Sequence, residues 1–243
     1  MSTLLEIAGL EKRFGGVVAV DRCTFSVARG TITGLIGPNG SGKTTVFNLV
    51  TGYVKADAGQ IRFDGRRVRR ASPGQLARRG LIRTFQQARI FPQLTLVQNL
   101  SLAVQGPWWD LRRAAVPPAD RARADELLHE FGLSGHADLQ AAELSYGQQK
   151  LLEFATTLIS RPQLVLLDEP TAGVNPVVVE HITSHVRRLN EQGLTFLVVE
   201  HDMNVVMSLC DPVIVLDRGA KIAEGAPTQV QADPAVLDAY LGD

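Results

Sequence analysis

A glycine-rich loop between an apolar run and a helix-like run constrains the fold most strongly. The loop reads Gly37-Pro38-Asn39-Gly40-Ser41-Gly42-Lys43-Thr44-Thr45 and matches the spacing G-x-x-x-x-G-K-[ST]. Residues 31–36 before it predict a strand, and residues 46–50 after it predict a helix. The glycines allow successive N–H groups to point inward, and the helix N-terminus adds partial positive charge. This context favours a polyphosphate cradle over an ordinary glycine-rich turn.

The side chains of this loop have expected tasks in holding a nucleoside triphosphate and Mg²⁺. Lys43 is expected to reach the β- and γ-phosphates, and the Thr44 hydroxyl is expected to ligate Mg²⁺. The remaining cofactor-binding residues expected here are Asn39, Gly40, Ser41, Gly42 and Thr45.

A second stretch supplies acidic groups at the end of an apolar strand. Residues 164–167 are apolar, as in a parallel strand buried on both faces, and Asp168 and Glu169 follow them. Ligands of open α/β sheets lie at the carboxyl ends of strands, so both carboxylates are expected beside the cradle. Asp168 is then the expected Mg²⁺ partner, and Glu169 the expected general base for an attacking water. A strand ending in Asp-Glu is common, and the phosphate loop is what favours the functional interpretation.

A third stretch, Leu144-Ser145-Tyr146-Gly147-Gln148-Gln149, has the spacing of a helix cap. Ser145 and Gln148 form a predicted capping box that opens a helix with an apolar face of Leu151, Leu152, Ala155, Leu158 and Ile159. The stretch also resembles the signature sequence of the ABC ATPases. That resemblance implies that Ser145, Gly147 and Gln148 bind the nucleotide of a second subunit, in a head-to-tail dimer with two nucleotides at its interface.

Other residues match positions of the same family. The resemblance implies that Phe14 stacks on adenine, although a Phe at a strand end is more often a core residue. It implies that Gln86 contacts Mg²⁺ and the attacking water, and that His201 contacts the γ-phosphate. Asn175 stands in the dimer-contact loop where most ABC ATPases have Asp. The other histidines are expected to be structural or solvated, namely His129, His136, His181 and His185.

Several short motifs resemble more narrowly the ATPases of branched-chain amino acid importers. They are residues 73–75, 77–80, 83–86, 145–149, 172–176, 200–203 and 239–242. This resemblance implies ATP hydrolysis coupled to transmembrane transport. It also implies a second ATPase subunit, two transmembrane permease subunits, an extracytoplasmic solute-binding protein, and a peripheral position at the cytoplasmic face of the inner or plasma membrane. Three alternatives stay open: an ATPase of a lipopolysaccharide-type exporter, a soluble ABC ATPase acting on ribosomes or DNA, and a P-loop kinase.

Composition is that of a soluble globular protein, with 243 residues, 45% hydrophobic and 21% charged. No apolar run approaches the ~18–20 residues that span a bilayer, and the N-terminus lacks the pattern of a secretory signal, so a cytosolic protein is expected. Cys23 and Cys210 lack metal-site spacing and are expected to be reduced packing residues.

The formal net charge is zero, yet arginines gather between residues 62 and 83. They are Arg62, Arg66, Arg67, Arg69, Arg70, Arg78, Arg79 and Arg83. Such a cluster could bind RNA or lipid headgroups, but a solvated face is favoured and no nucleic acid is expected as a partner.

Hydrophobic patterning predicts an α/β fold that combines antiparallel strands with strand–helix units. Alternation predicts antiparallel strands over about 3–30 and 59–70. Strand–helix units of a mostly parallel sheet are expected over about 31–51, 80–86 and 162–217, and short helices over 227–243.

Helical periodicity separates the middle of the chain from the rest. Ala124, Leu127, Leu128 and Phe131 recur at helical spacing before Gly132, within a helical region of about 95–160. Taken with the resemblance, residues 1–243 are expected to form one P-loop NTPase domain of ABC type. Residues 1–94 and 161–243 would form its nucleotide-binding core with an antiparallel β part, and 95–160 an inserted helical signature subdomain.

Overall fold

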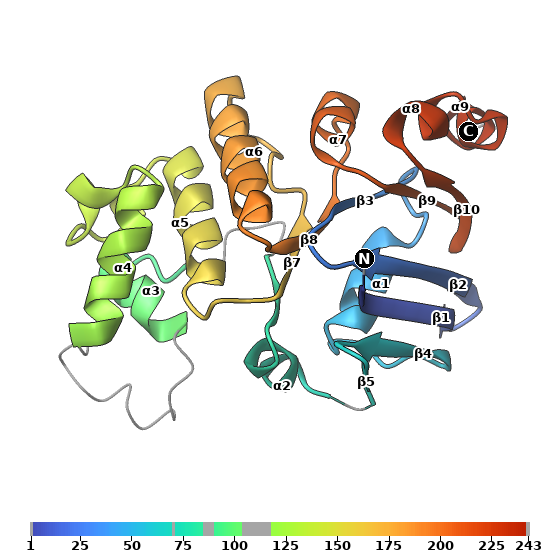
Figure 1. Cartoon of the computed structure of the whole chain (residues 1–243), viewed down its shortest axis with the longest axis horizontal. Helices are drawn as coiled ribbons and strands as arrows, with labels where there is room; N and C mark the ends of the chain where they lie inside the picture. Colours follow the sequence, from blue (N-terminus) through green and yellow to red (C-terminus); the bar gives the residue numbers. More distant parts are fainter. Residues whose placement is uncertain (1, 70, 85–89, 104–117, 242–243) are drawn as a thin grey trace. The chain divides into compact units, whose positions relative to one another are not determined.

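A computed structural model describes residues 2–69, 71–84, 90–103 and 118–241. The chain divides into two compact units. The first comprises Met1–Arg83, Gln163–Glu169 and Thr183–Asp243, and the second comprises Thr84–Pro162 and Pro170–Ile182. The first unit is α/β, and the second is built from helices in its described residues (Figure 1). The predicted helical segment 95–160 falls within the range of the second unit, which also takes in 170–182.

A six-stranded sheet forms the centre of the first unit, in the order β10-β9-β3-β8-β7-β6. The strands are β3 (Ile32–Ile36), β6 (Leu81–Arg83), β7 (Leu164–Asp168), β8 (Thr195–Val199), β9 (Val213–Asp217) and β10 (Ala220–Gly225). All neighbours pair in parallel except the edge strand β10, which is antiparallel to β9. Every residue of β3, β7 and β8 is buried, which explains their continuous apolar runs. The predicted mostly parallel core sheet is confirmed.

A second, antiparallel sheet of the same unit has the order β2-β1-β4-β5. Its strands are β1 (Thr3–Phe14), β2 (Val17–Ala28), β4 (Ala58–Phe63) and β5 (Arg66–Arg67). Burial alternates along the second half of β2, so one face of this sheet packs inward and the other meets solvent. The antiparallel strands expected over 3–30 and 59–70 are therefore confirmed.

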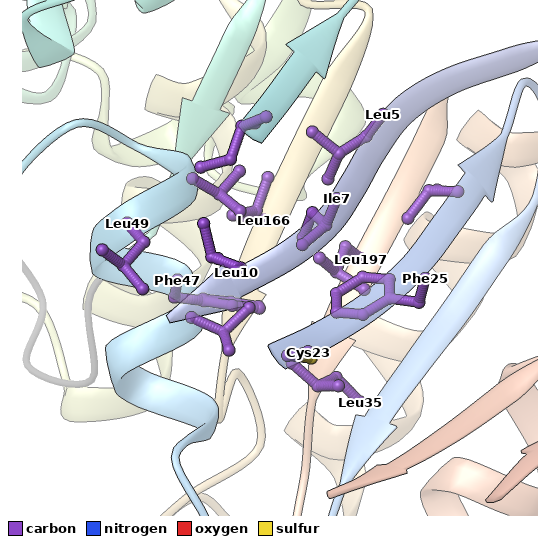
Figure 2. Packing of buried hydrophobic residues seen from close by; sticks show 14 of the residues in the cluster. Leu5, Ile7, Leu10, Cys23, Phe25, Leu35, Phe47, Leu49, Leu166 and Leu197 are labelled. Carbon is purple, nitrogen blue, oxygen red and sulfur yellow. The ribbon is translucent and has the colours of Figure 1, made fainter. Parts of the chain in front are cut away.

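The two sheets and helix α1 (Lys43–Val50) share one apolar core (Figure 2). The antiparallel sheet contributes Leu5, Ile7, Leu10 and Phe25, and the parallel sheet contributes Leu35, Leu166 and Leu197. Phe47 and Leu49 of α1 pack into the same cluster. Because α1 is held there, the loop that precedes it is fixed at the carboxyl end of β3.

Shorter helices complete the first unit. They are α2 (Pro73–Arg78), α7 (Met203–Leu209), α8 (Pro227–Gln231) and α9 (Pro234–Leu241). The last two confirm the expectation of short helices in the tail, and both pack on β10. None of the helices in the described part of the chain is long and apolar enough to cross a membrane.

The second unit contains α3 (Leu96–Ala103), α4 (Pro118–Glu130) and α5 (Tyr146–Leu158), with short 3₁₀ turns η2 (Ser134–His136) and η3 (Ala141–Glu143). Ala124, Leu127 and Leu128 are buried as their spacing predicted. Phe131 packs edge-to-face on Phe154 of α5, with 5.3 Å between ring centroids. Helix α6 (Pro176–Glu191) begins in the second unit and ends in the first.

Both cysteine thiols are buried and should be unreactive in the folded chain. Cys23 and Cys210 are free and buried, and burial raises the pKa of each thiol to about 12. Because the thiolate is the reactive form, we expect no labelling by a thiol reagent at neutral pH until denaturant unfolds the chain. Absorbance during labelling with a disulfide reagent measures this. Rapid reaction of either thiol without denaturant would contradict the packing described above.

Candidate active site

The phosphate loop adopts a backbone that only glycine accommodates at its critical positions. Gly37 and Gly42 have φ of +148° and +103°. A Cβ on Gly37 would lie 2.0 Å from the Leu216 carbonyl oxygen, and one on Gly42 would lie 2.5 Å from that of Ala19. Gly42 also caps α1, with no hydrogen bond from a side chain of the described residues. The N-terminal amides of this helix are therefore left for an anion.

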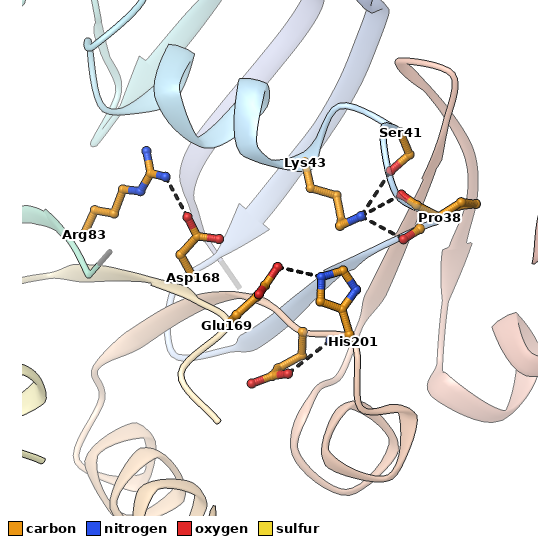
Figure 3. A network of polar contacts seen from close by, with 9 residues as sticks. Pro38, Ser41, Lys43, Arg83, Asp168, Glu169 and His201 are labelled. Atoms are coloured by element: carbon orange, nitrogen blue, oxygen red, sulfur yellow. Dashed lines mark hydrogen bonds and ion pairs between the residues drawn. The ribbon is translucent and has the colours of Figure 1, made fainter. Parts of the chain in front are cut away.

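Lys43 is folded over its own loop (Figure 3). Its Nζ donates to the carbonyl oxygens of Gly37 and Pro38, each at 2.8 Å, and to Ser41 Oγ at 3.4 Å. Burial lowers the pKa of Lys43, while Glu169 and Asp168 act in the opposite direction. The next residue, Thr44, is exposed, as are Asn39 and Gly40. The ammonium and the Thr44 hydroxyl are thus both carried by the first turn of α1.

The carboxylates after β7 lie at the same end of the parallel sheet. Asp168 is buried, and Glu169 follows it with a backbone φ of +49°, a conformation that is rare outside glycine. The Glu169 amide donates to the carbonyl oxygen of Val199 at the end of β8, 2.9 Å away. This hydrogen bond holds the strained residue against the neighbouring strand.

His201, just beyond β8, faces Glu169. Its Nε2 lies 2.5 Å from Glu169 Oε1, so an Nε2–H donates to the carboxylate (Figure 3). The Glu169 side chain is 15% exposed and that of His201 is 45% exposed. The pair therefore lies at the surface of the site, where a water molecule can reach it.

Arg83 is a site residue that the sequence analysis missed by placing it in a solvated arginine cluster. Its Nη2 donates to Asp168 Oδ2 and its Nη1 to Asn48 Oδ1, both at 2.6 Å. The side chains of Arg83 and Asp168 are each 6% exposed. One signal was present in the sequence. Arg83 directly follows the apolar residues Leu81 and Ile82, just as Asp168 directly follows the apolar run 164–167.

The residues of the signature stretch lie together in the second unit. Ser145 caps α5: the Gln148 amide donates to Ser145 Oγ at 3.4 Å, and the Ser145 amide donates to Gln148 Oε1 at 2.9 Å. The predicted capping box and the buried apolar face of this helix are confirmed. A Cβ on Gly147 would lie 2.8 Å from Val178 Cγ2 of α6, so a glycine permits that close approach.

Phe14 ends β1 and is 50% exposed, which rules out the core interpretation. Lys12 Nζ lies 5.3 Å from its ring centroid and 2.8 Å from Asp57 Oδ1. The Arg13 amide donates to the other oxygen of Asp57 at 2.7 Å. The Phe14 ring is thus exposed to solvent, and the Lys12 ammonium lies over it.

Two other expected residues have separate outcomes. Asn175 caps the start of α6, where its Oδ1 accepts from the Val178 amide at 3.0 Å. Gln86 lies outside the described residues.

Comparison with known proteins identifies the family. A family model described as "ABC transporter" matches residues 20–172, more than half of the chain. The chain belongs to the ABC transporter family. This confirms the family expected from the signature stretch. A second model, described as "Branched-chain amino acid ATP-binding cassette transporter", matches residues 220–243 of this ABC protein.

Relatives resemble this ABC protein along nearly its whole length. BraF of Pseudomonas aeruginosa, a high-affinity branched-chain amino acid transport ATP-binding protein, is 38% identical over 251 residues, covering 99% of this chain and 98% of BraF. The ADP conformation of MJ1267, an ATP-binding cassette of an ABC transporter, has a TM-score of 0.90 at 34% identity and covers 100% of both chains. A dimeric post-hydrolysis state of the cassette MJ0796, bound to ADP and Pi, has a TM-score of 0.79 at 27% identity, covering 92% of this chain and 99% of that one.

Proposed function

We propose that this chain is the ATP-binding and ATP-hydrolysing subunit that powers an ABC importer for branched-chain amino acids or related solutes. One observation carries the ATPase assignment. The phosphate loop, the Asp168–Glu169 pair and His201 follow β3, β7 and β8, which are adjacent parallel strands. Their side chains therefore gather at one edge of the sheet, where ligands of open α/β sheets bind. Near-full-length identity to branched-chain amino acid transport ATP-binding proteins supports the choice of transporter.

The first turn of α1 and the end of β7 fit a site for Mg²⁺. This ion takes oxygen ligands and keeps several waters, so one hydroxyl and one carboxylate suffice from the protein. We assign these to Thr44 and Asp168. Bound there, Mg²⁺ would neutralise part of the charge on the phosphate oxygens. Lys43 and the loop amides would bind the same oxygens, as would the side chains of Ser41 and Thr45.

Glu169 and His201 have the geometry of a base and the group that orients it. Phosphoryl transfer to water needs positioning and charge stabilisation, because the transition state is loose. Glu169 would accept the proton of the attacking water, and His201 would fix the carboxylate and contact the γ-phosphate. We assign Gln86 to the same water and metal by family resemblance.

The signature residues Ser145, Gly147 and Gln148 are proposed to complete the site of a second ATPase subunit. An exposed Ser and a close-packed Gly open a helix of 13 residues, whose N-terminus favours anions. Closure of two subunits would then add donors to the γ-phosphate that neither subunit has alone. Hydrolysis would be coupled to dimer geometry.

The complete complex is proposed to contain a second, related ATPase, two permease subunits and an extracytoplasmic solute-binding protein, with this chain at the cytoplasmic face. Native mass spectrometry of the detergent-extracted complex tests the assembly. Two copies of this chain without a second ATPase would reject the heterodimer and favour the lipopolysaccharide-type exporter. Association with ribosomes or DNA, with no membrane subunits, would reject transport altogether.

Phe14→Ala should weaken ATP binding roughly tenfold, because base stacking on an aromatic contributes about 1–3 kcal/mol. Phe91→Ala is a matched control, since Phe91 is a similarly exposed aromatic at 57%. Titration calorimetry measures the affinity, and Phe14→Trp should restore it. Unchanged affinity in Phe14→Ala would remove Phe14 from the proposed contact with adenine.

Glu169→Gln should leave ATP binding intact and slow hydrolysis by about 10²–10⁴-fold, because the amide keeps the shape of the side chain but cannot accept the proton. ATP and Mg²⁺ should then trap a dimer on size-exclusion chromatography. Glu191→Gln, at an exposed position at the end of α6, is the control. Wild-type turnover in the Glu169 variant would remove this residue from the role of base.

Substitutions at Ile90 or Phe91 should uncouple hydrolysis from transport without affecting nucleotide binding. The exposed Phe91 ring is carried by a rigid backbone: its amide donates to Asn99 Oδ1 at 2.7 Å, and its carbonyl oxygen accepts from Asn99 Nδ2 at 3.0 Å. A fixed, exposed aromatic suits a docking contact with a permease subunit. Cysteines at both positions should cross-link to the membrane subunits. Failure to cross-link, with normal transport in Phe91→Ala, would place the docking surface elsewhere.

A further inference from the structure

Arg83 joins three parts of the site through one buried guanidinium. It ends β6, its Nη2 donates to Asp168 Oδ2 at the end of β7, and its Nη1 donates to Asn48 Oδ1 on α1. The guanidinium carbon also lies 5.5 Å from the ring centroid of Phe47 on α1. Asn48 lies one helical turn after Thr44. The cation therefore contacts the expected metal carboxylate and the helix that carries the expected metal hydroxyl.

The charge of Asp168 requires such a partner before any ligand binds. Its side chain is 6% exposed, and an ionised carboxylate withdrawn from water is unfavourable unless it is paired and hydrogen-bonded. The Arg83 guanidinium, 2.6 Å from Asp168 Oδ2, is such a partner. The guanidinium thus supplies at Asp168 the positive charge that a metal ion would otherwise supply.

We propose that Arg83 is an internal counter-ion that stands in for the metal at Asp168 and weakens metal binding at this carboxylate. The inference rests on the proposed function, in which Asp168 ligates Mg²⁺. Like charges repel, so a divalent ion brought to Asp168 is repelled by the guanidinium 2.6 Å from that carboxylate. Arg83 is a positioning residue, because its effect on the reaction passes through Asp168.

The proposal predicts opposite effects of Arg83 on metal affinity and on metal-free stability. Removing the charge should tighten metal binding, because the competing cation is gone. It should also lower the thermal midpoint without metal, because Asp168 loses the ion pair with Arg83. If Arg83 instead only oriented the carboxylate, its removal would weaken metal binding. The sign of the change in metal affinity therefore separates the two roles.

The experiment uses the full chain with saturating ADP and Mn²⁺ as the probe, with free Mn²⁺ measured by electron paramagnetic resonance. Arg83→Met keeps the apolar stem without the charge, and its Mn²⁺ dissociation constant should fall roughly tenfold. Arg83→Gln keeps a donor toward Asp168 and serves if the Met variant does not fold, with the same expected direction. Arg83→Lys keeps the charge and should bind Mn²⁺ like the wild type.

Arg79→Met is the matched control. The Arg79 guanidinium likewise lies over a ring, 5.6 Å from the centroid of Phe63, but its Nη2 donates to the carbonyl oxygens of Phe63 and Arg66. Its substitution should leave Mn²⁺ affinity unchanged.

Thermal midpoints measured without nucleotide or metal complete the experiment. Addition of Mn²⁺ with ADP should raise the midpoint of Arg83→Met more than that of the wild type.

Unchanged or weaker Mn²⁺ binding in the uncharged Arg83 variants overturns the proposal. Asp168→Asn separates this failure from failure of the proposed function. Weaker Mn²⁺ binding in Asp168→Asn keeps Asp168 as a metal ligand whatever Arg83 does. Wild-type Mn²⁺ affinity in Asp168→Asn removes the metal assignment itself, and the inference on Arg83 with it.

Discussion

Burial of the central strands on both faces is the constraint on which the rest of the structure depends. β3, β7 and β8 are wholly buried, and the apolar core that covers one face also anchors α1. Charged side chains cannot be placed along such strands without loss of hydration. They are therefore confined to the ends, where the chain leaves the sheet. The order of the strands then decides which polar groups become neighbours.

The charged groups gathered at the carboxyl ends of these strands are hydrogen-bonded within the first unit itself. Lys43 donates to its own loop, Asp168 pairs with Arg83, and Glu169 accepts from His201. Each contact satisfies a polar group that lies partly or wholly out of water. In the proposed function, a nucleotide that binds here replaces hydrogen bonds that these groups already make within the chain.

Local patterns predicted the parts of this site that depend on sequence neighbours. The phosphate loop, the run before Asp168 and the capping box of Ser145 are each contained in fewer than ten consecutive residues, and their form follows from backbone chemistry. The Arg83–Asp168 pair depends on β6 lying beside β7, with Arg83 opposite Leu166. The support of Phe14 by Lys12 and Asp57 depends on an irregular register between β1 and β4. No local pattern carries such information.

The paired strands β6 and β7 also end close to where the chain crosses between its two units. It leaves the first unit directly after Arg83, and again directly after Glu169. Arg83 and Glu169 are thus the last residues of the first unit before these two crossings. Because the backbone is continuous at both crossings, a displacement of Arg83 or Glu169 also displaces Thr84 or Pro170, the first residue of the second unit at that crossing.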